Sequence, residues 1–254
     1  MVESRQIRLK SRPSGTPTVD NFELATVMLR EPAPGEVQVK NLWMTVDPYM
    51  RNRMGDHAST VATFEPDESM HGAVTGSASA NEHLHKRGDL VSTMYDWRLP
   101  FRLGQVLEGG AIGKIAVSND PGFKQGDLVS NNLGWREGFN APAAAVQKLN
   151  TFGLPPQALL GVAGMPGLTA WAGLLKIATL RSGDVVFVSG ASGAVGSAVC
   201  QIAKLKGNLV IGSAGGEDKC AFLRQIGVDR VINYKATSNL TSALLEAAPD
   251  GIDV

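Results

Sequence analysis

The feature that most constrains this sequence is a glycine-rich loop between an apolar segment and an alanine-rich one. The apolar segment spans 184–189, the loop glycines are Gly190, Gly193 and Gly196, and the alanine-rich segment spans 194–206. A strand, a tight glycine turn and a helix in this order let the backbone approach a pyrophosphate, while the helix N-terminus offers unpaired N–H groups. The spacing is GxxGxxG rather than GxGxxG, so the surrounding strand and helix carry the prediction of a nucleotide site. A turn that serves only helix–strand packing is the alternative.

Strands and helices alternate through the second half of the chain. Apolar segments at 184–189, 208–214 and 230–234 predict strands, while Ala- and Leu-rich stretches at 156–180 and 194–206 predict helices. This alternation is typical of a Rossmann-type, doubly wound parallel sheet covered on both faces. Nucleotide contacts are expected from residues of the loop and near the strand ends: Gly190, Ala191, Gly193, Ala194, Val195, Gly196, Gly215, Lys219 and Tyr234.

The end of the second strand of this sheet indicates which nucleotide is bound. NAD sites usually place an acidic residue there to hold the ribose 2′-hydroxyl, but positions 213–214 carry Ser and Ala. Lys219 and Tyr234 are placed to meet a 2′-phosphate, although they also suit a solvated helix residue and a core edge. Glu217 and Asp218 argue against NADP, yet they also fit as first-turn acids that complement the helix dipole. We expect NADPH or NADP+ as the cofactor.

Residues 1–154 differ from residues 155–254 in their pattern of apolar residues and turns. Short segments such as 35–48, 109–118 and 124–133 show strand-like patterning and are separated by Gly, Pro and Asp turns. Short strands at close spacing suggest a sandwich or a small barrel. The chain is therefore predicted to hold a β-rich domain over 1–154 and an α/β domain over 155–254.

The β-rich part contains an internal duplication. Residues 64–98 align with residues 101–136, and both segments carry a Gly-rich strand, the sequence GDLVS and a Trp-Arg pair. Repeat arrays generally need at least three copies, so two copies indicate a local duplication within one domain. We expect the second copy to fill the native strand positions and the first to be an insert.

Charge and composition exclude several function classes. The 24 Lys+Arg balance the 24 Asp+Glu, so no net field attracts nucleic acid or an anionic membrane. The sequence has no apolar run of transmembrane length and no signal-peptide core at its start. Its two cysteines, Cys200 and Cys220, are too few for a disulfide framework and are expected to be buried thiols. We expect a soluble, cytoplasmic protein without nucleic-acid or membrane partners.

Several short motifs, taken together and in order, resemble a known family. DPYMR at 47–51, LEGG at 107–110, GDLV at 126–129 and GMPGLTA at 164–170 precede the glycine loop. They are similar to the zinc-independent branch of the medium-chain dehydrogenase/reductases, which contains prostaglandin and leukotriene reductases, plant double-bond reductases and bacterial curcumin reductases. The resemblance implies a GroES-like β-barrel domain followed by a Rossmann domain. It also implies hydride transfer from NADPH to the β-carbon of an α,β-unsaturated aldehyde or ketone.

The resemblance also implies site residues. Tyr49, in DPYMR, would lie in the active-site cleft as hydrogen-bond donor, with the proton coming from Tyr49 or solvent. A phenol with a pKa of about 10 stays protonated at neutral pH, although Tyr49 also fits as an aromatic packed beside Pro48. Met165 and Thr169 would lie where their helix meets the cofactor. Trp171 fits a core position as well as a cleft position.

Metal binding is not expected. Zinc-dependent members of the wider family take Cys and His ligands from the β domain, and residues 1–154 contain no cysteine. The histidines, His57, His71, His83 and His85, lie close together in the sequence. His83 and His85 would share one side of an extended segment, with His71 as a third ligand, but we expect a solvated insert.

The chain ends at 248–254, where the fourth strand of this family's nucleotide sheet begins. An incomplete Rossmann domain leads us to expect weak or absent turnover. It also makes doubtful the homodimer formed by the resembling family, which pairs through the part of the sheet that would follow. A zinc-free quinone oxidoreductase and a catalytically silent NADPH-binding protein are the alternatives to an enone or alkenal reductase.

Overall fold

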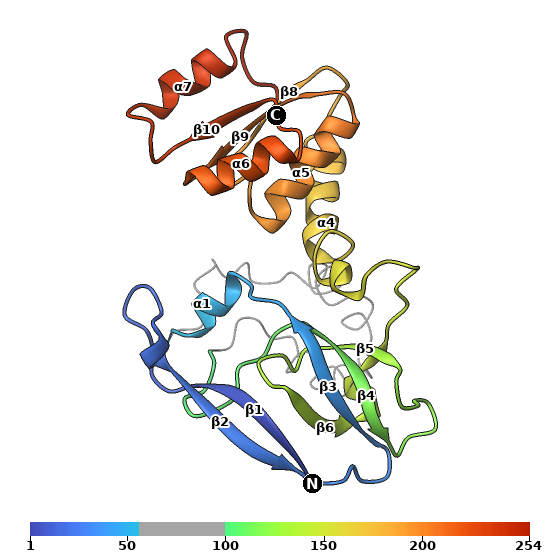
Figure 1. The fold of residues 1–254 in the computed structure, drawn as a ribbon. Coiled ribbons are helices and arrows are strands. Elements are labelled where there is room, and N and C mark those ends of the chain that lie inside the picture. The colour runs from blue at the N-terminus through green and yellow to red at the C-terminus, as the bar shows by residue number, and fades with distance from the viewer. Residues whose placement is uncertain (56–99) are drawn as a thin grey trace, which may run out of the picture. The chain divides into compact units, whose positions relative to one another are not determined.

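The computed structural model describes residues 1–55 and 100–254, which form two compact units, Met1–Asn150 and Thr151–Val254 (Figure 1). The first copy of the duplication, 64–98, lies outside the described residues, together with every histidine of the chain. In the part of the chain that is described, no helix is long and apolar enough to cross a membrane.

The first unit is built from two antiparallel sheets. One pairs β1 with β2 along their whole length, and the other has the strand order β6-β3-β4-β5-β7. The strands are β1 (Val2–Leu9), β2 (Phe22–Leu29), β3 (Glu36–Met44), β4 (Ala111–Ser118), β5 (Leu128–Asn131), β6 (Gly138–Pro142) and β7 (Gln147–Lys148). The described helical segments are η1 (Val19–Asn21), α1 (Tyr49–Arg53) and η3 (Ala143–Ala145). Strands β4 and β5 both come from the second copy of the duplication.

The two sheets of this unit are joined without closing into a single barrel among the described strands. An isolated bridge pairs Gln6 of β1 with Arg136, and the Ser4 hydroxyl donates to the Gly138 carbonyl of β6 at 2.8 Å. The alternation read at 37–40 places Val37 and Val39 in the core, because successive strand residues face opposite sides. The architecture is therefore the β-rich unit that the short segments predict.

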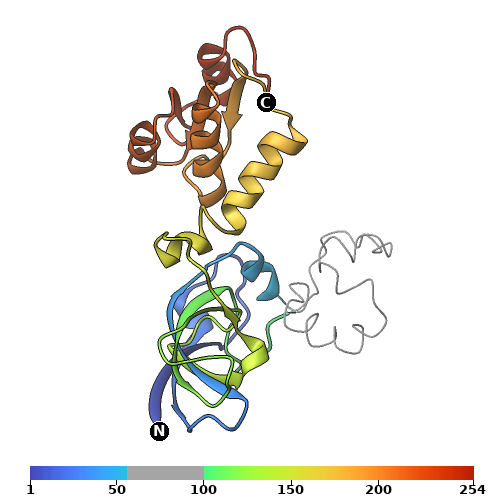
Figure 2. The same cartoon turned by 90° about the vertical axis from the view of Figure 1, so that its right-hand side faces the viewer.

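The second unit has a three-stranded parallel sheet in the order β10-β9-β8. Its strands are β8 (Val185–Val188), β9 (Leu209–Ala214) and β10 (Arg230–Asn233). Its helical segments are η4 (Pro156–Leu160), α4 (Met165–Trp171), η5 (Ala172–Ile177), α5 (Ala194–Leu205), α6 (Glu217–Gln225) and α7 (Leu240–Ala247). Figure 2 shows α4 beside α5. The predicted Rossmann-type parallel sheet is confirmed.

Both faces of this sheet carry a core. On one face Val186 and Val210 pack with Cys200 of α5, and on the other Ile211 and Ile232 pack with Ala247 of α7 (Figure 1). Because each strand sends side chains to both faces, its central residues are apolar, as the sequence indicates. The last residues lie against β8: the Phe187 amide donates to the Val254 carbonyl at 2.8 Å.

The helical stretch predicted over 156–180 is broken in the structure. A short 3-10 segment ends at Leu160, α4 begins at Met165, and a π-helical turn, η5, completes the stretch. The break falls between Gly161 and Gly164, where a Cβ on Gly164 would overlap the Leu159 carbonyl. Only glycine permits this close approach, so Gly164 sets where the helix restarts.

Candidate functional site

The glycine loop leaves backbone donors free at the N-terminus of α5. Gly193 is the residue before the helix, and the first helical hydrogen bond runs from the Ser197 amide to the Gly193 carbonyl at 2.9 Å. The three amides before it, at 194–196, therefore have no acceptor within the helix. The Ala191 amide donates to the Ser213 carbonyl at 3.0 Å, which fixes the loop to the end of β9. Such an arrangement can bind a phosphate group.

Glycine is required at positions 190 and 196 of the loop for different structural reasons. Gly190 has a φ of +56°, in the left-handed region that favours glycine, and the strand turns out of the sheet there. A Cβ on Gly196 would lie 2.6 Å from the Gly190 carbonyl oxygen and 2.8 Å from the Ala191 Cα. Gly196 therefore lets α5 approach the loop, as the packing alternative requires, and this close packing also orients the free amides.

A second feature lies at the carboxyl ends of β9 and β10. A Cβ on Gly215 would lie 2.5 Å from the Tyr234 hydroxyl oxygen, so the structure brings these two predicted residues together. The Tyr234 side chain is 47% exposed, and its hydroxyl makes no hydrogen bond to the protein within residues 1–55 and 100–254. The strand end carries only the buried Ser213 and Ala214, so no acid occupies the place of a ribose-binding carboxylate.

The charged residues of α6 lie in the first turns of the helix after β9, as the sequence predicts. Lys219 is exposed there, and its contact with a 2′-phosphate stays a prediction. Glu217 forms an ion pair with Arg224 at 2.6 Å, farther along the same helix. Glu217, one of the two acids that argue against NADP, is thus paired with a cation.

Sequence reasoning missed Lys235. Its Cε would lie 3.0 Å from a Cβ on Gly215, so its side chain bends over the same glycine as Tyr234. Lys235 directly follows Tyr234 after the third strand, and that adjacency was the available signal. Strand alternation places neighbouring residues on opposite faces, but β10 ends at Asn233 and the chain turns there.

The predicted residues of α4 lie on an exposed helix. Met165 is 72% exposed, and the Thr169 hydroxyl donates to the Met165 carbonyl at 2.8 Å, within the helix itself. Trp171 is 43% exposed, and the Lys176 ammonium lies 5.2 Å from its ring centroid. Trp171 is therefore not a fully buried core residue. The structure places Met165 and Thr169 on one helix, α4, which packs beside α5, and their contact with the cofactor stays a prediction.

Tyr49, in the first unit, is the first residue of α1 and is half-buried. It packs against a core cluster that includes Met50 and Leu107. Burial, and next the charge of Asp47, raise the pKa of the phenol, while the nearby Arg53 opposes the shift. Tyr49 therefore keeps its proton at neutral pH and can donate a hydrogen bond, while its contacts also fit the packed-aromatic alternative.

Two of the sequence motifs meet beside Tyr49. Arg53, from the helix of DPYMR, forms an ion pair with Glu108 of LEGG at 3.3 Å, and its guanidinium lies 4.0 Å from the centroid of the Phe101 ring. The Arg136 guanidinium donates to the Leu107 carbonyl at 3.3 Å, and burial lowers the pKa of Arg136. The Arg53 contacts hold α1 against the segment before β4, and the Arg136 hydrogen bond ties that segment to the one before β6.

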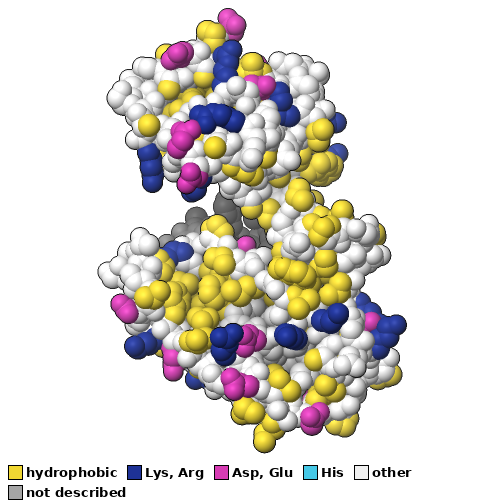
Figure 3. Space-filling view, in the orientation of Figure 1, with side chains coloured by type: hydrophobic (Ala, Val, Ile, Leu, Met, Phe, Trp, Pro, Cys, Tyr) yellow, Lys and Arg dark blue, Asp and Glu magenta, His cyan; other side chains and the backbone are white. Residues whose placement is uncertain are grey.

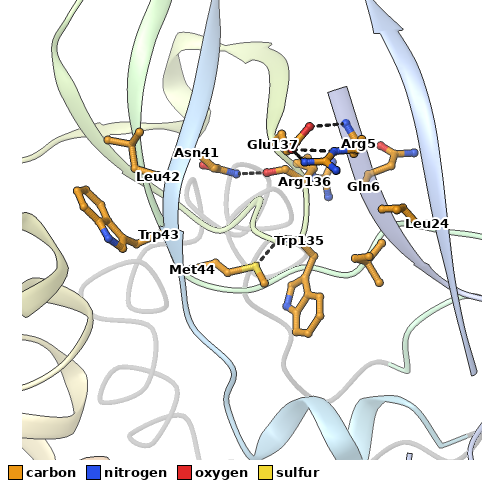
Figure 4. Close-up of a pocket in the computed structure, with 11 residues that line it drawn as sticks. Arg5, Gln6, Leu24, Asn41, Leu42, Trp43, Met44, Trp135, Arg136 and Glu137 are labelled. Atoms are coloured by element: carbon orange, nitrogen blue, oxygen red, sulfur yellow. Dashed lines mark hydrogen bonds and ion pairs between the residues drawn. The ribbon is translucent and has the colours of Figure 1, made fainter. Parts of the chain in front are cut away.

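A pocket of about 280 Å³ opens near this cluster (Figure 4). It is lined by residues of three strands and of the segment before β6: Arg5, Gln6, Ile7, Leu24, Asn41, Leu42, Trp43, Met44, Trp135, Arg136 and Glu137. The Trp135 Nε1 is buried without a hydrogen-bond partner in the described structure. Figure 3 shows hydrophobic side chains gathered on the viewed face of this unit, and Leu42, Trp43 and Met44 of β3 are exposed. The pocket can accept an apolar group.

Ligands for a metal do not converge in the described residues 1–55 and 100–254: no group of three His, Cys, Asp or Glu could hold an ion. The predicted alternative ligands His71, His83 and His85 lie outside these ranges. Cys200 and Cys220 are both buried, and burial raises the pKa of the Cys200 thiol to about 11.

Comparison with known families gives matches in both units. Residues 5–99 and 98–149 match a family described as the N-terminal domain of oxidoreductase. Residues 194–254 match a family described as zinc-binding dehydrogenase. The two ranges matched by the N-terminal family, 5–99 and 98–149, together cover more than half of the chain.

Individual relatives are similar over nearly the whole chain. A Bacillus subtilis protein with the provisional name of NADP-dependent oxidoreductase is 40% identical over 251 residues, 98% of this chain and 63% of its own length. The NADP(+)-dependent 2-alkenal reductase of Nicotiana tabacum is 34% identical over 259 residues, 100% of this chain and 65% of its own length. The chain thus spans less than two thirds of these relatives.

A solved structure has the same fold. The crystal structure of CurA from Vibrio vulnificus in complex with NADPH has a TM-score of 0.76 and 34% identity. The match covers 98% of this chain and 63% of CurA. The similarity therefore extends through both units.

Proposed function

Since the chain belongs to the medium-chain dehydrogenase/reductase family, in the branch of the prostaglandin, alkenal and curcumin reductases, we propose that it binds NADPH through its second unit. We further propose that the reaction is reduction of a C=C bond conjugated to a carbonyl group. The observation that carries the proposal is the pairing of free amides at 194–196 with an acid-free end of β9. The names of the relatives support the cofactor and the substrate class.

The residues of the second unit fit NADPH. The pyrophosphate would lie at the free amides of Ala194, Val195 and Gly196, where the helix dipole favours negative charge. The 2′-phosphate would lie beyond β9, where Gly215 leaves open the space under the Tyr234 hydroxyl. A carboxylate in that place would repel the phosphate, and positions 213–214 carry none. These features favour NADPH over NADH.

Tyr49 is the residue of the first unit to which we assign a chemical role. When bound, NADPH would supply a hydride, with its electron pair, to the β-carbon of the substrate. Negative charge then develops on the carbonyl oxygen, and a hydrogen bond from Tyr49 would stabilise it. The α-carbon takes a proton from Tyr49 or solvent, which gives a saturated aldehyde or ketone. The raised pKa of Tyr49 keeps the phenol protonated for this donation.

The test measures the transfer of deuterium from the cofactor to the product, so that slow turnover is still detected. The chain is incubated with NADPH carrying deuterium at the transferred C4 position and with a linear 2-alkenal, an aryl enone or a benzoquinone. Deuterium at the β-carbon of a saturated carbonyl product supports the proposal. Deuterium at the carbonyl carbon, or reduction of the quinone alone, would contradict the substrate class. NADPH binding without any transfer would identify a silent binding protein.

A further inference from the structure

The loop at 10–18, between β1 and η1, contacts the end of α1 (Figure 1). The Arg12 guanidinium of this loop donates hydrogen bonds to the carbonyl of Met54, at 3.1 Å, and to that of Gly55, just past the end of the helix. The same guanidinium donates to the Phe101 carbonyl at 3.3 Å. One side chain of the loop therefore holds both the end of α1 and the segment before β4.

A second arginine makes the reverse contact, from the helix to the loop. Arg51, in the middle of α1, donates from its Nε and Nη2 to the Gly15 carbonyl at 3.1 and 2.6 Å. The loop and the helix thus hold each other through two guanidinium groups, each of which bonds to backbone carbonyls. Because these carbonyls are fixed by the fold of the unit, the four bonds between Arg12, Arg51 and the two segments define where α1 lies.

The helix is too short to hold its own geometry. It spans five residues, Tyr49–Arg53, and isolated helices of this length are not stable in water. The last carbonyls of a helix have no intrahelical partner, and Arg12 supplies donors for the carbonyls at this end. The orientation of α1, and with it the direction of its first residue, Tyr49, therefore depends on Arg12.

Arg12 acts on Tyr49 through the backbone and not through its charge. The pKa of the phenol is raised mainly by burial, and the charges that shift it further belong to Asp47, Arg53 and Glu108. Arg12 contacts the opposite end of the helix from Tyr49. An effect of Arg12 on the phenol would thus come from the position of α1.

We propose that Arg12 is a positioning residue for the reduction: by holding the end of α1, it sets the direction in which the Tyr49 hydroxyl donates its hydrogen bond to the carbonyl oxygen of the substrate. This inference rests on the proposed function, since it adds a residue to the machinery around Tyr49. In this role Arg12 acts only through α1. Loss of its side chain leaves the Tyr49 phenol present but frees the helix from the segment before β4.

A double-mutant cycle separates positioning of Tyr49 from a general effect on the fold. The rate of deuterium transfer from labelled NADPH to a linear 2-alkenal is measured in a single turnover for the full chain, Arg12→Ala, Tyr49→Phe and the double variant. We expect Arg12→Ala to slow transfer about tenfold, with less than about a twofold change in the alkenal concentration that gives the half-maximal rate. Because Arg12 acts through Tyr49, the double variant should be slower than Tyr49→Phe by less than about twofold.

Two further variants control for charge and for the loss of an arginine. Arg30→Ala is the matched control, because Arg30 is an exposed arginine of the same unit that also donates to a carbonyl, that of Glu31, at 2.8 Å. It should leave the transfer rate unchanged. Arg12→Lys keeps the charge but lacks the planar fork that reaches several carbonyls, so it should recover less than about half of the lost rate.

Titration of the phenol tests the positioning without turnover. The difference in phenolate absorbance between Arg12→Ala and the double variant gives the pKa of Tyr49 when the helix is released. We expect this pKa to fall towards the ordinary value of about 10, because a freed α1 exposes Tyr49 to water. The same difference between the unmodified chain and Tyr49→Phe should give the raised pKa.

Each outcome decides the inference. Additive losses in the cycle, full activity of Arg12→Lys or an unchanged phenol pKa in Arg12→Ala would show that Arg12 does not position Tyr49. Failure of the proposed function has a different signature, because the unmodified chain would then transfer no deuterium, and the phenol titration alone would decide the role of Arg12. Circular dichroism establishes the fold of each variant. If Arg12→Ala unfolds, Arg51→Ala replaces it, since it breaks the same tie from the helix side.

Discussion

The two units build their candidate sites by opposite means. In the second unit the nucleotide site consists mainly of backbone: amides at the start of α5, and glycines that allow close approach. In the first unit Tyr49 is positioned by side chains, through the Arg53–Glu108 ion pair and apolar packing. A site made of backbone depends on the positions of glycines, and these can be seen in a single sequence. A site made of side chains depends on contacts between distant segments, and these cannot be seen in a single sequence.

The largest expected effect comes from filling the backbone site. Gly196→Val would place side-chain atoms against the Gly190 carbonyl and Ala191, which already lie within 2.8 Å of a Cβ. We expect destabilisation of about 3 kcal/mol and at least a tenfold loss of NADPH affinity. Urea unfolding and fluorescence titration measure the two effects. Gly173→Ala is the control, because a Cβ there meets no atom within 4 Å, and unchanged binding by Gly196→Val would contradict the role of the loop.

A comparable effect on the first unit should come from its side-chain network. The Asn41 amide nitrogen donates to the Leu133 and Arg136 carbonyls at 2.9 and 3.0 Å, and its oxygen accepts from Asn131 at 3.0 Å. Asn41→Leu keeps the volume but leaves these partners unsatisfied, so we expect a loss of about 2 kcal/mol. Denaturant unfolding measures this loss. The exposed neighbour Lys40→Ala should change stability by less than about 0.5 kcal/mol, and equal stability of the two variants would refute the network.

Much of this contrast could be anticipated from the sequence. The order of strands and helices over 184–234 could be predicted from the apolar runs and from the glycines at 190–196. Both patterns involve residues that are close together in the sequence. The meeting of Arg53 with Glu108, residues separated by 55 positions, has no local signature. The hydrogen bonds that the Asn233 side chain accepts from the Gly216 and Lys235 amides were equally hidden, since an Asn at a strand end fits many turns. Lys235 was overlooked because a lysine after a strand also suits a solvated turn.

The protonation of Tyr49 should have a moderate effect that is specific to the first unit. Its pKa is raised mainly by burial, so the folded state holds the phenolic proton more tightly than the unfolded chain does. The resulting stabilisation is present below pH about 10 and is lost as the pH rises through the folded-state pKa. The difference in phenolate absorbance between the chain and Tyr49→Phe reports this titration. The same difference in urea should titrate near the ordinary value, and coincident curves would show no shift.

The smallest expected effect comes from an exposed ion pair. The Arg5 guanidinium, hydrogen-bonded to Glu137, lowers the pKa of that carboxyl to about 2. Because the folded-state pKa is depressed, its stabilisation is present above pH 4.5 and is lost as the pH falls towards 2. Glu137→Gln should flatten this part of the stability profile only slightly, since both side chains are exposed. Urea midpoints between pH 5 and pH 2 measure the slope.

The matched control for that ion pair is Glu23→Gln. Glu23 is exposed and forms no ion pair among the described residues of the first unit. Its replacement should leave the acid slope as in the unmodified chain. A slope reduced equally in both variants would mean that general charge, not the Arg5 contact, sets the acid response.

Calorimetric titration of the full chain with NADPH and, separately, with NADH is the direct test of the nucleotide site. We expect saturable binding of NADPH, at least about tenfold tighter than NADH, which corresponds to about 1.4 kcal/mol. Gly196→Val should abolish the heat of binding. Equal affinity for the two nucleotides would contradict recognition of the 2′-phosphate, and absence of binding to either would contradict the nucleotide site itself.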